Sequence, residues 1–437
     1  MANEAKKKFK FSPLVKGLLF TILCLFIWRL GVHIQLPFVE ITKEFNSLSE
    51  TNIFGFLDIF SGGALSQFSV LALGISPYIT SSIVVQLLSM DIIPAFKEWS
   101  EEGETGKAKL NQWTRYIALF LAFVQALALV IALEVTYSGQ LFQYVPNMEY
   151  NAFIFVYIAL VLTAGTAFTL WLSDQITMHG VGNGASLMIV AGIIAGFPSM
   201  FVSLYNQYLG ESVSNAPKAS DILTFIFIVV LFLAIIVAVV WMEGLQRKIP
   251  IQYANRPAAS KMRGKQDSDI PLKLNSASVI PVIFASTLLS LPMTILNFVE
   301  GESIWWEMVF SYEKPIGFVL YIVLIFIFSF FYSFLQIDPD KISDNLKKQN
   351  AYILGVKPGE ETAAFISSVL FKITLLGATY LSILAALPIV ISHIFNLSSS
   401  VQIGGTSLMI VVGVAIETVK QLKTESQAQE YHGFMAD

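Results

Sequence analysis

The sequence predicts an all-α membrane protein that crosses the bilayer ten times, and three observations carry this prediction. Hydrophobic residues make up 55% of the 437 residues and charged residues only 13%, whereas about 25% of an average soluble domain is charged. Apolar runs of roughly 20 residues, the length of a transmembrane helix, recur along the chain. Lysine and arginine gather in alternate connections between these runs. A soluble fold of this composition would expose a very large apolar surface, so lipid must cover much of it.

The apolar runs differ in strength along the chain. Those at 222–242 and 316–337 are almost purely apolar, whereas those at 74–90, 276–296 and 404–420 are weaker because they carry Ser, Thr, Pro or Gly. The ten expected spans are 15–36, 74–90, 116–137, 152–172, 185–205, 222–242, 276–296, 316–337, 363–391 and 404–420.

The distribution of positive charge predicts the orientation. Ten spans put both termini on one side, and 23 of the 27 Lys and Arg residues then fall on that side or at its span edges. The other side has only Arg29, Lys43, Lys218 and Lys314. Cytoplasmic loops carry the excess of Lys and Arg in membrane proteins. We therefore expect both termini in the cytoplasm.

Ten spans divide into two halves of five. Because five is odd, the second half enters the membrane in the opposite orientation to the first, which is the arrangement of an inverted repeat. The expected organisation is a cytoplasmic N-terminus 1–14, a first half 15–205, an external connection 206–221, a second half 222–420 and a cytoplasmic tail 421–437.

The second span of each half, 74–90 and 276–296, is polar and interrupted by proline. Weak spans in matching positions of two halves indicate a functional interface. The alternative is that both spans are buried in the helix bundle, with Ser and Thr packed against neighbouring helices. Ile79 and Ile83 in the first of them share one helix face at i, i+4. An aliphatic collar in a polar-lined path would exclude ions, although this spacing more often indicates packing.

Segment 53–73 is apolar but lies between the first two spans on the external side. It contains Asp58 and the pair Gly62-Gly63, and it cannot be a further span without reversing everything downstream. Irregular backbone at membrane depth is tolerated only inside protein or against a water-filled cavity. We therefore expect a short helix that re-enters a cavity, with a helix lying on the external surface as the alternative.

The motifs of enzyme active sites are absent from the sequence. It has no HExxH, CxxC or P-loop pattern, so we expect no catalytic site, no metal site and no cofactor. Charges within the expected spans are few, and Arg29, Lys372 and Glu417 lie near span ends, where snorkelling or pairing accommodates them.

Eight stretches of the chain, in order and covering most of its length, resemble the SecY family, the pore subunit of the bacterial Sec protein-translocation channel. One is LALGISPYITSSIVVQLL, and another is GGTSLMIVVGVAIE near the C-terminus. The stretches are 61–74, 71–88, 101–116, 174–198, 246–256, 271–286, 343–362 and 404–417.

The resemblance implies two pseudo-symmetric halves around an hourglass pore. Segment 53–73 would be the plug that seals the pore from outside, and spans two and seven, with three and eight beside them, would form a lateral gate to lipid. The implied pore ring is Ile79, Ile83, Ile193, Ile283 and Ile410, and the polar gate candidates are Thr80, Gln86, Gln125 and Thr287. The implied plug residues are Phe54, Phe56, Leu57, Asp58, Ile59, Phe60, Gly62, Gly63 and Leu65.

The resemblance also implies a function and partners. The chain would conduct unfolded secretory polypeptides across the bacterial cell membrane and release transmembrane segments sideways into lipid. Its partners would be the preprotein and its signal peptide, SecE-like and SecG-like small membrane subunits, membrane lipids, the motor ATPase SecA and the ribosome. The last two would dock on loops 243–275 and 338–362, at Arg247, Lys248, Arg256, Lys347, Lys348 and Lys357.

The basic loops have a simpler alternative explanation, because positive-inside topology and lipid headgroups account for part of their charge. The second loop also departs from the family pattern. Lys357 stands where the family usually has arginine, and Asn350 and Leu354 stand where it has glycine and proline. Lysine keeps the charge but loses the two-pronged guanidinium.

Two other functions compete with translocation. A secondary transporter of a small solute would share the inverted halves and broken helices, but it would normally carry buried charged residues at the midplane, which the expected spans lack. An intramembrane protease would need a nucleophile paired with a base at membrane depth, and no expected span pairs Ser with His.

Overall fold

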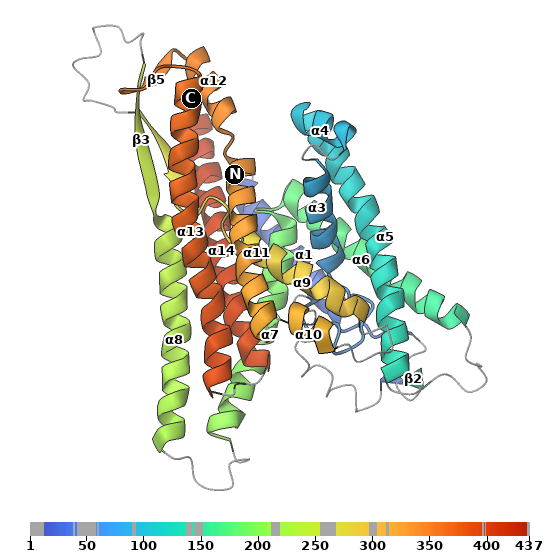
Figure 1. Cartoon of the computed structure of the whole chain (residues 1–437). Helices are drawn as coiled ribbons and strands as arrows, with labels where there is room; N and C mark the ends of the chain where they lie inside the picture. The colour runs from blue at the N-terminus through green and yellow to red at the C-terminus, as the bar shows by residue number, and fades with distance from the viewer. Residues whose placement is uncertain are drawn as a thin grey trace, which may run out of the picture. The chain divides into compact units, whose positions relative to one another are not determined.

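The computed structural model describes residues 13–37, 40–41, 58, 61–89, 93–136, 142–143, 152–210, 219–253, 268–296, 304–311, 314–395, 397 and 399–434. Helices dominate this part of the chain (Figure 1). It divides into two compact units. The first comprises Met1–Ile222, Leu291–Gly301 and Leu397–Asp437, and the second comprises Leu223–Ser290 and Glu302–Asn396.

The first unit is a helix bundle in which long helices lie side by side. Its elements are α1 (Pro13–Val32), β1 (Glu40–Ile41), α3 (Ser76–Leu88), α4 (Pro94–Glu101), α5 (Glu104–Thr136), β2 (Phe142–Gln143), α6 (Ala152–His179), α7 (Gly184–Tyr208) and α14 (Ser399–Phe434). Helix α5 packs along α3, α4 and α6, and α7 packs along α6 and α14. The core includes Phe68, Val130 and Leu162, so the segment before α3 is part of this bundle.

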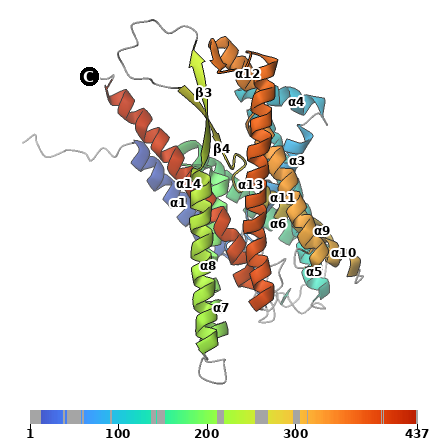
Figure 2. The same cartoon turned by 60° about the vertical axis from the view of Figure 1, so that its left-hand side comes forward.

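The second unit combines long helices with a small sheet at one end (Figure 2). Its elements are α8 (Ala219–Gly244), β3 (Gln246–Tyr253), β4 (Ser268–Lys273), α9 (Ile280–Leu296), α10 (Ile304–Phe310), α11 (Pro315–Gln336), α12 (Pro339–Lys348), β5 (Ala351–Ile353) and α13 (Glu360–Phe395), with the ends of α8 and α9 assigned to the first unit. Helix α13 packs along α11 and also contacts α12.

The sheet has strand order β4-β3-β5, with both pairs antiparallel. Ile249 faces Ile270 across the first pair, and Ile251 faces Ile353 across the second. One apolar core holds this sheet against α12 and the first turns of α13. The core residues are Ile249, Leu272, Leu346, Ala351, Ile353, Ile366, Val369 and Ile373.

Seven helical regions among the described residues are long and apolar enough to cross a bilayer. They correspond to seven of the expected spans, and the two proline-interrupted spans form the shorter helices α3 and α9, of 13 and 17 residues. The tenth expected span lies inside α14. Large apolar side chains such as Leu19, Phe26 and Leu233 stay exposed on these helices, as lipid-facing positions require.

Candidate functional site

The aliphatic residues expected to form a ring are buried. Ile79 and Ile83 lie on α3, Ile193 on α7 and Ile410 on α14, all in the first unit, whereas Ile283 lies on α9 in the second unit. The two faces of α7 differ sharply in exposure at these positions, because Ile193 is 1% exposed and its neighbour Ile194 is 50% exposed. Within the first unit, the expected ring positions therefore point into the protein and not toward lipid.

The part of the plug segment that the structure describes is a compact turn organised by Asp58. The Asp58 carboxylate accepts a hydrogen bond from the backbone N–H of Ser66 at 2.7 Å, and its carbonyl oxygen accepts from Gly63 N–H at 2.8 Å and Ser61 Oγ at 2.9 Å. Burial raises the pKa of this carboxyl, and the hydrogen bonds from Ser66 and Leu65 oppose that rise. Phe54, Phe56, Leu57, Ile59 and Phe60 lie outside the described residues.

Gly62 is wedged between α1 and α7. A Cβ atom built on it would lie 2.6 Å from the indole of Trp28 and 3.2 Å from the Cα of Gly192, the residue before Ile193. Its φ of +73° is also a backbone conformation that favours glycine. Arg29, beside Trp28, donates a hydrogen bond to the Gly62 carbonyl oxygen at 2.5 Å. The plug segment is therefore seated against the helix that carries Ile193.

A second attachment holds the chain after this turn. Val70 N–H donates to the carbonyl oxygen of Ile34 at 3.0 Å, and Leu36 N–H donates to that of Phe68 at 3.2 Å. These two backbone hydrogen bonds tie the segment just before α3 to the chain that leaves α1. We call the first contact, Arg29 to Gly62, the latch, and the second, 34–36 with 68–70, the anchor.

The gate candidates are polar side chains on partly or fully buried helix faces. Thr80 on α3 donates to the carbonyl oxygen of Ser76 at 3.3 Å, and Gln86 donates to Ser82 Oγ at 3.0 Å. Thr287 on α9 donates to the carbonyl oxygen of Ile283 at 2.7 Å. Gln125 is half-buried on α5, the helix that packs along α3. Thr80, Gln86 and Gln125 thus share the first unit, and Thr287 belongs to the second.

The two expected docking loops are built into one body, because β3 and β4 come from the first loop and α12 and β5 from the second. Their basic side chains lie on its surface: Lys248 on β3, Lys347 and Lys348 in the last turn of α12, and Lys357 before α13 are exposed. Lys357 pairs with Glu361 at 3.3 Å. Arg247 lies on β3 as well, and Arg256 lies outside the described residues.

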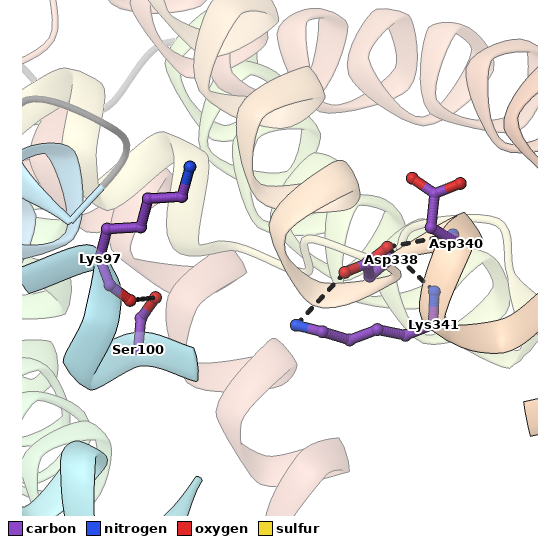
Figure 3. A network of polar contacts seen from close by, with 5 residues as sticks. All are labelled: Lys97, Ser100, Asp338, Asp340 and Lys341. Carbon is purple, nitrogen blue, oxygen red and sulfur yellow. Dashed lines mark hydrogen bonds and ion pairs between the residues drawn. The ribbon is translucent and has the colours of Figure 1, made fainter. Parts of the chain in front are cut away.

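Helix α12 begins at a side-chain cap. Asp338 Oδ1 accepts hydrogen bonds from the backbone N–H of Asp340 at 3.1 Å and of Lys341 at 3.3 Å, and Lys341 Nζ lies 3.3 Å from Oδ2 (Figure 3). An aspartate at this position satisfies N–H groups that the helix leaves open.

Figure 3 also shows a contact in α4, where Ser100 Oγ donates a hydrogen bond to the Lys97 carbonyl oxygen in the last turn of the helix. The two atoms are 2.8 Å apart.

Sequence reasoning missed the role of Arg29 and Trp28, because the latch joins residues 33 positions apart. It also missed the joining of the two loops into one sheet. Asn350, which stands where the family pattern has glycine, has a local explanation. Its φ of +51° lies in the left-handed region, which asparagine tolerates better than most residues.

Comparisons with known proteins agree with this architecture. A family model described as SecY matches residues 69–419. The protein translocase subunit SecY of Bacillus licheniformis is 43% identical over 420 residues, covering 96% of each chain, and that of Bacillus subtilis is 42% identical over 427 residues, covering 97% of each.

Solved structures share the fold at low sequence identity. One described as a protein conducting channel matches with a TM-score of 0.66 at 17% identity, covering 97% of this chain and 95% of the other. Sec61 in a canine ribosome-channel complex matches with a TM-score of 0.63 at 16% identity, over the same shares. These matches confirm the predicted channel fold with ten helices and a plug. The chain belongs to the SecY family of protein translocase subunits.

Proposed function

We propose that the pore ring and the plug together seal the channel of this translocase subunit in its resting state. The observation that carries the proposal is the seat of Gly62 between Trp28 and Gly192, directly beside the ring candidate Ile193. A plug held at this point lies against the level of α7 at which the ring would be narrowest.

The ring would act by excluding water. A narrow collar of isoleucine side chains offers ions no replacement for their hydration shell, and it can dewet when no substrate fills it. Buried aliphatic positions on α3, α7 and α14, namely Ile79, Ile83, Ile193 and Ile410, support this proposal, with Ile283 of α9 as the contribution of the second unit. An unfolded polypeptide would displace the plug and be surrounded by these aliphatic side chains.

The lateral gate is proposed for α3 and α9. Both are short and rich in Ser and Thr, and hydroxyl donors such as those of Thr80 and Thr287 are satisfied within their own helices. Such side chains suit a seam that opens to lipid, because these two hydrogen bonds do not depend on a neighbouring helix. Sideways release of transmembrane segments follows from such a seam.

We propose that the cytoplasmic partners dock on the body formed by β3–β5 and α12. Its exposed lysines suit the acidic surfaces of a motor ATPase such as SecA and of ribosomal RNA. The similarity to a channel solved with a ribosome supports a ribosome as one partner. SecE-like and SecG-like subunits would cover apolar faces beside lipid. Both termini would lie in the cytoplasm of a bacterial cell.

Reconstitution into vesicles tests the proposed function. With SecA, ATP and a small one-helix subunit, the channel should move an unfolded preprotein into a protease-protected space. Uptake of a small solute without protein protection would favour the secondary transporter instead.

The topology has its own test. Single cysteines at Ser260 and Ser214, in a Cys24→Ala background, should react with an impermeant thiol reagent from opposite sides of the membrane. Labelling from the same side would overturn the expected orientation of the spans between them.

A further inference from the structure

We propose that Glu243, Asn275 and Ser278 form a joint that fixes the start of α9 to the base of the β3–β4 hairpin. Through this joint, a displacement of the docking hairpin is passed to the helix assigned to the lateral gate. The inference rests on the proposed roles of the hairpin and of α9, but the contacts themselves lie within the second unit.

Glu243 is a buried carboxylate in an unfavourable place. It is 6% exposed and lies in the last turn of α8. The C-terminal end of a helix carries a partial negative charge, which disfavours a carboxylate there. Removal from water disfavours it further unless donors compensate. A glutamate that is both buried and at a helix C-terminus needs specific hydrogen-bond donors to stabilise its carboxylate.

The turn before α9 supplies two donors to one oxygen of Glu243. Asn275 Nδ2 donates to Glu243 Oε1 at 3.0 Å, and Ser278 Oγ donates to the same oxygen at 3.3 Å. Asn275 Nδ2 also donates to the carbonyl oxygen of Ser278 at 3.1 Å, which closes the turn on itself. Asn275 is as buried as Glu243. The three residues therefore link the end of α8 to the residue two positions before α9.

The backbone of the turn is tightly constrained. Ser278 has a φ of +53°, in the left-handed region that serine rarely adopts. Leu274 N–H donates to the carbonyl oxygen of Leu245 at 3.0 Å across the base of the hairpin. On α13, a Cβ atom at Gly377 would lie 2.8 Å from the Leu274 carbonyl oxygen, so that helix lies directly against the turn. The joint lies where the hairpin, α8 and α13 meet.

The hairpin is stiff enough to transmit a displacement. Its two strands pair over six residues, from Gln246 with Lys273 to Ile251 with Ser268. Its inner face is packed in the core that includes Leu346 and Ile366. Because α9 starts at Ile280, only the turn held by Glu243 separates the stiff hairpin from the helix.

A charge swap tests the joint. Asn275→Asp places two carboxylates side by side and should release the start of α9. Adding Glu243→Gln restores one amide and one carboxylate in exchanged positions, so the double variant should again hold the start of α9 in place. Ser382→Ala is the matched control, because Ser382 is buried on α13 and its hydroxyl has no hydrogen-bond partner within the described residues.

The first measurement is the spin–spin distance distribution between nitroxides at Asp269 on β4 and Leu288 on α9, both exposed, in the Cys24→Ala protein. We expect a narrow distribution in the parent and the control, a broad one in Asn275→Asp, and a narrow one again in the double variant. A parent-like distribution in Asn275→Asp overturns the joint. If Asn275→Asp does not insert, the double variant decides, and its failure to regain the parent distribution overturns the joint as well.

The second measurement separates transmission from docking. In Asn275→Asp we expect SecA affinity within about twofold of the parent and a transport rate lower by about tenfold, the effect of losing one hydrogen bond to a charged group. A parallel fall in affinity and transport would mean that the cluster only shapes the docking surface. Failure of the parent itself to transport protein would overturn the proposed function, while the distance measurement would still test the joint.

Discussion

The guanidinium of Arg29 donates a hydrogen bond to the carbonyl oxygen of Gly62, which gives a charge in the last turn of α1 a partner in the plug segment. This latch differs from the anchor, in which backbone hydrogen bonds tie 68–70 to 34–36. A single charge-assisted bond can be broken without unravelling the strand-like anchor. The anchor therefore gives the plug a firm base, and the latch is a contact that can be released.

Arg29→Met should loosen the plug without disturbing the helix. A hydrogen bond to a charged group contributes about 1.5–3 kcal/mol, so the released fraction of plugs should rise roughly 10- to 100-fold. Ion conductance of the resting channel in planar bilayers measures the release.

The matched control for this prediction is Gln67→Ala. It removes the exposed contact between Gln67 Oε1 and His33 Nδ1 at 2.9 Å, close to the anchor. Exposed contacts of this kind contribute little, so conductance should stay at the parent value. Equal leak in both variants would show that the latch has no special role.

Gly62→Ala should prevent the plug from seating, whereas Gly63→Ala should have a much smaller effect. Both glycines have positive φ, so both substitutions carry a similar backbone cost of about 1–2 kcal/mol. Only at Gly62 does the new Cβ meet Trp28, at 2.6 Å, since at Gly63 the nearest atom lies 4.0 Å away. Crosslinking of the plug to α7 should fall for the first variant only, and a similar loss in both would contradict the wedge.

The spacing of residues predicted the helices better than it predicted the contacts. The i, i+4 pair Ile79 and Ile83 was expected on one face, and both are buried on α3. In contrast, nothing local in the sequence pairs Arg29 with Gly62 or Glu243 with Asn275, because both contacts join distant segments. The sheet was missed for the same reason, since β5 reaches β3 from the other loop, about 100 positions away in the sequence.

The plug should be less firmly seated as pH rises. Burial raises the pKa of Asp58 above its ordinary value of 3.8, so the seated plug favours the protonated carboxyl. This contribution to seating is fully present below pH 3.8 and is lost as pH rises through the raised pKa. Resting conductance should therefore increase with external pH in that window.

Asp58→Asn checks the origin of this pH dependence. Its side-chain oxygen can still accept the hydrogen bond from Ser66, but it cannot ionise. The variant should keep a low conductance at every pH. Persistence of the pH dependence in Asp58→Asn would assign it to another group.

The docking surface should respond to charge and salt. Reversing Lys347 and Lys348 to Glu should weaken SecA or ribosome binding by about tenfold or more at low salt, and the difference should shrink as salt screens the charges. The double variant Lys107→Glu with Glu104→Lys exchanges an exposed ion pair at the start of α5, outside the body formed by β3–β5 and α12, and keeps the net charge, so it should bind nearly normally. Affinity across a salt series measures both, and an unchanged affinity and salt slope after reversal would place docking elsewhere.

Conductance of ring variants in planar bilayers measures whether the isoleucine ring seals the resting channel. Replacing Ile83, Ile193 or Ile410 by Asn or Gly should wet the constriction and raise the resting ion conductance by about tenfold or more. Ile194→Asn is the matched control, since Ile194 lies next to Ile193 but is 50% exposed, and it should leave the conductance at the parent value. Unchanged conductance in all three ring variants, in channels that insert normally, would show that the ring does not seal the channel.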